Sequence, residues 1–140
     1  MLKIVAATLS ILAVPLTADA FQTPAPDGAR VYVVEPRDGA TVGNPVTVVF
    51  GLENLGVAPA GVEADRTGHH HLLINVDPSE VDMTAAIPAD DRHVHFGGGQ
   101  TQITKELPPG THRLWLLVGD RNHVPHDPPI MSEPITITVE

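Results

Sequence analysis

The sequence predicts an all-β protein, an immunoglobulin-like antiparallel β-sandwich of about seven strands. Apolar residues come in short runs separated by Gly, Pro, Asn and Asp, which is a strand-and-turn pattern rather than a helical one. The 14 Pro and 12 Gly of the 140 residues strengthen this reading, since both residue types interrupt helices. Seven short strands in about a hundred residues are typical of such a sandwich.

The first 20 residues are expected to be a signal peptide. Lys3 supplies a positive start, and the apolar run from Ile4 to Leu16 is shorter than the roughly 20 residues that span a membrane. Small residues at Ala18 and Ala20 favour cleavage after Ala20, which predicts a periplasmic or secreted protein with no membrane insertion after cleavage. Residues 21–29 are then a flexible N-terminal segment, and residues 30–140 form one domain.

Composition narrows the functional classes. The formal net charge of −9 argues against nucleic-acid binding and favours cationic ligands. The absence of Cys excludes disulfides, thiolate ligands, a cysteine nucleophile and a lipid anchor on cysteine.

Each expected strand is a short apolar or alternating segment bounded by turn residues. Pro36 to Gly39 reads as the turn after the first strand, and Pro108 to Gly110 as the turn before the Trp115 strand. Two longer connections, 53–68 and 77–92, lack a strand pattern and are places where binding function often sits. The expected strands are Val31–Glu35, Val46–Leu52, His70–Val76, His93–Phe96, Thr101–Leu107, Arg113–Val118 and Ile135–Val139.

Strand alternation predicts where the histidines point. Leu72, Ile74 and Val76 share one face, so His69 and His71 take the other, and His70 falls on the aliphatic side. On the fourth strand, alternation separates the paired histidines from the apolar residues Val94 and Phe96 in the same way. If the two strands are neighbours, four imidazoles project from one surface, with cross-strand partners about 5 Å apart. These four are His69, His71, His93 and His95.

A third histidine group lies in the proline-rich segment 119–129, where prolines hold His123 and His126 at low entropic cost. Asp120 and Asp127 are nearby carboxylates that could complete or orient a metal site. Neutral imidazole suits late transition metals, so the sequence predicts a divalent ion, copper or zinc, as cofactor. The proposed ligands number more than one ion needs, so some would only support the others, or two ions are bound. They are His69, His71, His93, His95, His123, His126, Asp120 and Asp127.

Three functional classes stay open. The first is a carrier, buffer or sensor whose partners are the metal ion and another periplasmic protein. It is favoured over an enzyme because no nucleophile, general acid or arginine cluster accompanies the histidines. The second is a redox enzyme, because the pair His93 and His95 resembles the H-x-H strand pair of copper/zinc superoxide dismutase; the cysteines and zinc-loop pattern of that family are missing. The third is a structural sandwich module in which the histidines only form hydrogen bonds.

Several segments together resemble an exported bacterial family, domain-of-unknown-function family 4399. They are Glu35–Ala40, Gly68–Leu73, His93–Thr101 and His123–Pro129. The resemblance implies a small exported β domain without an assigned biochemical role, with the histidine segments as its site residues.

Overall fold

The computed structural model describes residues 22–140, and the predicted signal peptide with its cleavage site lies outside them. Within the described part of the chain, no helix is long and apolar enough to span a membrane. The strands are β1 (Arg30–Glu35), β2 (Thr41–Val42), β3 (Val46–Glu53), β4 (Gly56–Val57), β5 (Thr67–Ile74), β6 (His93–His95), β7 (Gln102–Lys105), β8 (Gly110–Gly119) and β9 (Ile135–Val139), with one short 3-10 helix, η1 (Pro78–Glu80), after β5.

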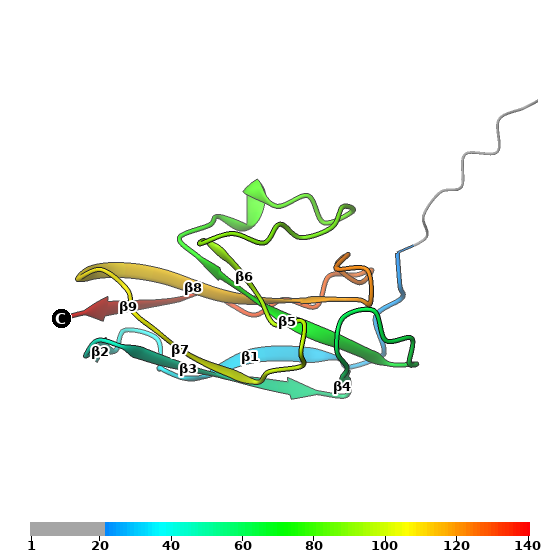
Figure 1. The fold of residues 1–140 in the computed structure, drawn as a ribbon, viewed down its shortest axis with the longest axis horizontal. Coiled ribbons are helices and arrows are strands. Elements are labelled where there is room, and N and C mark those ends of the chain that lie inside the picture. Colours follow the sequence, from blue (N-terminus) through cyan, green and yellow to red (C-terminus); the bar gives the residue numbers. More distant parts are fainter. Residues whose placement is uncertain (1–21) are drawn as a thin grey trace, which may run out of the picture.

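The strands form two layers, as Figure 1 shows. One sheet has the order β1-β3-β7, and the other has the order β2-β9-β8-β5-β4, with β6 pairing to β5. When the two-residue strands β2 and β4 are left out, seven strands remain. Of these, β1, β3 and β7 lie opposite β5, β8 and β9, and β6 pairs with β5. This is the division of immunoglobulin-like sandwiches, in which strands A, B and E oppose C, F and G. The predicted all-β sandwich is therefore confirmed.

The main core fills the space between the sheets. It includes Val48 and Phe50 from β3, Leu72 from β5 and Leu116 from β8, all buried. Alternation along these strands turns the apolar side chains inward, because successive residues point to opposite faces.

A second, smaller core covers the outer face of β5 and β8. Leu73, Trp115 and Leu117 are fully buried there against Ile87 from the long segment after β5. That segment lies over the larger sheet on the side away from β1 and β3 in Figure 1. The indole nitrogen of Trp115 donates to the Val76 carbonyl at 2.8 Å. The outer face of this sheet is therefore an interior, not a solvated surface.

The predicted strand of residues 70–76 is displaced toward the N-terminus. In the structure it begins at Thr67 and ends at Ile74, because Asn75 adopts a left-handed φ of 55°. The alternation breaks there, and Val76 joins the second core instead of sharing a face with Leu72 and Ile74.

Residues 22–29, expected to be flexible, are hydrogen-bonded to the domain. The Ala25 amide donates to the Asp127 carbonyl at 2.8 Å, and the Asp127 amide donates to the Thr23 carbonyl at 3.0 Å. The hydroxyl of Thr23 also donates to the Asp120 carboxylate at 2.7 Å. This segment lines the end of the sandwich where β5 begins and β8 ends.

Candidate metal centre

His69 and His71 stand on the outer face of β5, as strand alternation predicts. They lie opposite Gly119 and Leu117 of β8. The expectation that they project from a surface is wrong, because His69 is only 1% exposed and His71 is 0% exposed. The covering segments are β6 and the loop that follows β8, which bring two further imidazoles against them.

His95 comes from β6 and sits opposite His71 in the antiparallel pair. The centroids of these two rings are 5.1 Å apart. The Nε2 atom of His95 also lies 3.2 Å from the Nε2 atom of His69. The two predicted histidine strands are thus neighbours, which was the condition for their imidazoles to meet.

His123 completes the arrangement from the loop between β8 and β9. Its Nδ1 atom lies 3.1 Å from the Nε2 atom of His69. The loop turns sharply because the Asp120 carboxylate accepts hydrogen bonds from the amides of Asn122 and Val124. His123 itself adopts a left-handed φ of 66°, and its amide donates to the Asp120 carbonyl at 2.9 Å.

Together these side chains form what we call the four-histidine group: His69, His71, His95 and His123. Each offers one ring nitrogen, and the four nitrogens all lie within 4.8 Å of one another. A tetrahedral ion with metal–nitrogen bonds of about 2.0–2.1 Å requires nitrogen–nitrogen separations of about 3.3–3.4 Å. Two of the separations, 3.1 and 3.2 Å, are close to that value. The group has the composition and dimensions to hold a metal ion.

Hydrogen bonding alone leaves this group unsatisfied. Among the described residues, the Nδ1 atom of His69 and both ring nitrogens of His71 are buried without a partner. Buried polar atoms without partners destabilise a fold, so each calls for an explanation. A bound ion would be coordinated by one nitrogen of His71, and that nitrogen would then have a partner.

The electrostatics favour neutral imidazoles. Burial, together with a smaller effect of the neighbouring imidazoles, lowers the pKa of His69 to about 4 and that of His71 to about 3. Burial also lowers the pKa of His95. At neutral pH these rings carry a free lone pair, which is the form that coordinates metals.

The structure places the other predicted histidines outside the four-histidine group. His93 pairs with Leu73, and its Nδ1 atom lies 2.8 Å from the Asp90 carboxylate. His126 is buried on the other side of β5. A Cβ atom at Gly68 of that strand would lie 3.1 Å from the Cε1 atom of His126.

The two predicted aspartates also lie outside this group. The Asp120 carboxylate accepts hydrogen bonds that hold the turn carrying His123. Asp127 is exposed, and its backbone is hydrogen-bonded to residues 23 and 25. Two histidines were not among the predicted ligands. His70 points inward, and its ring centroid lies 5.1 Å from that of Phe50. His112 is hydrogen-bonded to the Asn75 side chain and to the Pro108 carbonyl.

Two glycines that were not among the predicted site residues border the site. A Cβ atom at Gly119 would lie 2.7 Å from Cε1 of His71 and 3.2 Å from Cα of His123. A Cβ atom at Gly97 would fall onto the His95 ring. A glycine inside or just after a strand often marks such a close approach, and this was the available signal.

The fold and site define a class, a two-sheet β-sandwich with a buried cluster of histidines on the outer face of its larger sheet. The family described as a domain of unknown function, DUF4399, matches residues 48–140, and the chain belongs to this family. The matched range contains every residue of the four-histidine group. No curated protein and no solved structure matches the chain.

Proposed function

We propose that this domain binds one divalent transition-metal ion, copper or zinc, through the four-histidine group and acts as a carrier, buffer or sensor of that ion. The observation that carries the proposal is the position of the His69 Nε2 atom. It lies 3.1 Å from a nitrogen of His123 and 3.2 Å from a nitrogen of His95.

A hydrogen-bonded cluster explains these distances less well than an ion does. A single ring nitrogen has either one proton or one lone pair, so His69 Nε2 can form one well-directed hydrogen bond and not two. A cation at the centre instead accepts one lone pair from each ring. The low pKa values of His69 and His71 support the same reading, since they keep both rings neutral.

The donor set favours copper or zinc. All four donors are imidazole nitrogens, and the chain has no cysteine to supply a thiolate. Imidazole ligands suit zinc, copper, iron and nickel, whereas magnesium and calcium prefer oxygen. The formal net charge of −9 also attracts cations to the protein.

Binding is favoured over catalysis because four protein nitrogens fill a tetrahedral site, while catalytic sites keep a position for water or substrate. A copper/zinc redox enzyme is the second candidate. Its support is the partial exposure of His95 and His123, which leaves one side of the group accessible. A purely structural module is the outcome if no metal binds.

We also propose export, on the features of residues 1–20. An exported carrier or buffer would exchange its ion with another periplasmic protein.

The test begins with elemental analysis of the protein purified from the periplasm, followed by competition titration with zinc and copper between pH 7.5 and 5. We expect one equivalent of metal. Its release should require a pH well below 6.5, the ordinary pKa of histidine, because burial lowers the pKa of His69 to about 4 and that of His71 to about 3. Superoxide dismutation and ester hydrolysis are assayed on the same samples, and no activity above that of the free ion is expected. Rapid superoxide turnover would favour the redox enzyme, and absence of tight binding would leave the structural module.

A further inference from the structure

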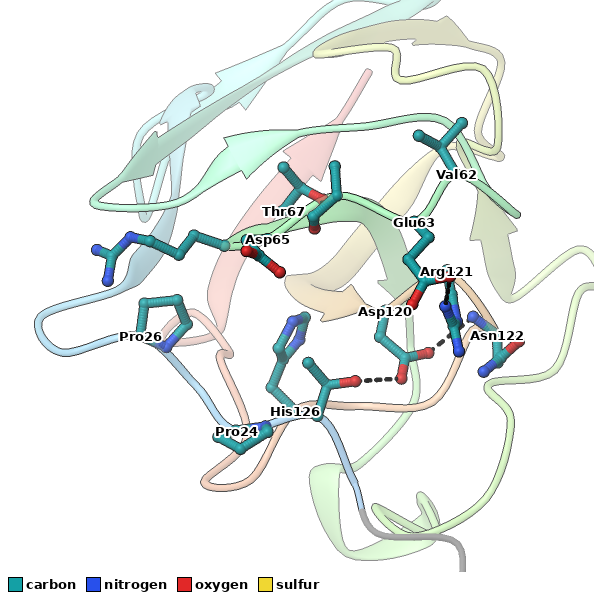
Figure 2. Close-up of a pocket in the computed structure, with 13 residues that line it drawn as sticks. Pro24, Pro26, Val62, Glu63, Asp65, Thr67, Asp120, Arg121, Asn122 and His126 are labelled. Carbon is teal, nitrogen blue, oxygen red and sulfur yellow. Dashed lines mark hydrogen bonds and ion pairs between the residues drawn. The ribbon is translucent and has the colours of Figure 1, made fainter.

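The first residues of the described chain are hydrogen-bonded to the loop that carries His123. We call residues 22–25 the N-terminal strap. The Thr23 hydroxyl donates to Oδ2 of the Asp120 carboxylate at 2.7 Å, and Figure 2 draws this bond as a dashed line. At the other end of the loop, the backbone of the strap exchanges two hydrogen bonds with Asp127. The strap therefore fixes the loop at both of its ends.

The Asp120 carboxylate connects the strap to the backbone of His123. Its other oxygen, Oδ1, accepts hydrogen bonds from the amides of Asn122 and Val124, at 2.8 and 3.1 Å. These are the two residues that flank His123. The φ of 66° at His123 lies in the left-handed region, which is uncommon outside glycine and persists where the surrounding structure holds it. Thr23 thus stabilises the carboxylate that keeps His123 in this conformation.

Gln22 adds a second connection, between the His123 loop and the segment that covers the larger sheet. Its side-chain amide donates to the Met83 carbonyl at 2.6 Å and to the Pro125 carbonyl at 3.0 Å. Farther along the covering segment, the Ile87 amide donates to the His123 carbonyl at 2.9 Å. Both contacts join the same two segments, so Gln22 supports the contact that Ile87 makes with His123.

We propose that Gln22 and Thr23 are positioning residues of the metal site. They fix the loop that brings His123 to the ion, and through this loop they set how tightly the ion is held. The inference rests on the proposed function. His123 is the ligand on which the strap acts, because within the four-histidine group it alone stands on a loop, whereas the others stand on strands β5 and β6. Release of the strap would loosen this loop and open one coordination position to water.

The variant Thr23→Val keeps the branched shape of threonine but removes the hydroxyl that donates to Asp120. We expect its affinity for zinc, measured by competition titration, to fall by about 10–100-fold, the scale for residues that orient metal ligands. X-ray absorption of the zinc-loaded variant should count fewer imidazoles than in the unchanged protein. Thr23→Ser keeps the donor and should restore the affinity. The matched control is Thr47→Val, which should leave the affinity unchanged. It removes an exposed hydroxyl that is hydrogen-bonded to that of Thr104 at 2.8 Å on the smaller sheet.

Gln22→Leu is a second variant, which removes the side-chain amide that donates to both segments and should also weaken zinc binding. Hydrogen exchange of the Asn122 and Val124 amides in the metal-free protein follows the loop itself, and it should be faster in both strap variants than in Thr47→Val. Exchange that is no faster would overturn the inference.

The zinc titrations separate this inference from the proposed function. If the unchanged protein binds zinc and Thr23→Val binds it as tightly as Thr47→Val does, the inference is wrong and the proposed function stands. If the unchanged protein binds no zinc or copper, the proposed function fails, and the strap has no metal site to support.

Discussion

The Nε2 atom of His69 lies 3.1 Å from the Nδ1 atom of His123, although 54 residues separate them in the chain. The contact exists because His69 pairs with Gly119 at the end of β8, and the chain then turns back at Asp120. The four histidines therefore come from β5, β6 and a loop after β8, and the group exists only when the sandwich is folded. Metal binding should consequently stabilise the fold by mass action.

Replacing Gly119 by Ala should weaken metal binding while leaving the sandwich folded. The added Cβ atom would lie 2.7 Å from the His71 ring, so the ring or the His123 backbone must shift. We expect a loss of about 10–100-fold in affinity, as for other residues that orient ligands. Gly43→Ala is the control, because a Cβ atom there meets nothing within 4 Å. Equal affinity for both variants, measured by competition titration, would argue against the site geometry.

His95 and His93 should differ sharply although they stand two residues apart on β6. His95→Ala removes a nitrogen of the four-histidine group and should lower affinity by more than the about 10–100-fold typical of supporting residues. His93→Ala removes only a ring that is hydrogen-bonded to Asp90, so it should change the affinity for zinc little. Isothermal titration with zinc compares the two variants, with circular dichroism to confirm the fold. A stronger effect of His93 would mean that the ligand set is different.

His70 should make the metal-free protein sensitive to acid. Burial lowers its pKa to about 4, whereas an unfolded histidine titrates near 6.5. Between these values the unfolded chain binds a proton that the native state does not, so stability falls as pH falls from about 6.5 to about 4. At pH 5 this costs about 2 kcal/mol. Urea unfolding at pH 7 and at pH 5 measures the loss of stability on acidification. In His70→Leu this loss should be smaller by about the same 2 kcal/mol. If the loss is the same in the variant as in the unchanged protein, the prediction is wrong.

Export predicts a defined N-terminus. Cleavage after Ala20 should give a mature chain that begins at Phe21, because the small residues before it suit a signal peptidase. Intact mass spectrometry of protein from the periplasm or medium measures this directly. A full-length product retained in the membrane would disprove the signal-peptide prediction.

The strand-and-turn pattern was enough to predict the architecture, and strand alternation oriented three of the four histidines of the group. It placed His69 and His71 on one face of β5 and His70 on the other. It placed His95 beside them only on the condition that the two histidine strands are neighbours, which the structure meets. These results follow from a period of two residues, which any regular strand obeys. The range of β9, Ile135–Val139, was predicted without error for the same reason.

The remaining details depend on contacts that periodicity does not encode. The outer face looked solvated because nothing in the alternation of β5 shows that Ile87 and the segment around it cover Leu73 and Trp115. The selection of His123 over His126 depends on the turn at Asp120, which directs two histidines of one loop to opposite sides of a strand. Loop geometry of this kind comes from hydrogen bonds between specific atoms, and a single sequence does not reveal them.

X-ray absorption spectroscopy of the zinc- or copper-loaded protein tests the central claim most directly, because it counts the imidazoles bound to the ion. The four-histidine group predicts one ion per chain with four imidazole nitrogens at about 2.0–2.1 Å, as for zinc bound by histidine. His95→Ala should lose one imidazole from this count, and His93→Ala should keep all four. A spectrum dominated by oxygen ligands, or an imidazole count that is unchanged in His95→Ala, would contradict the account.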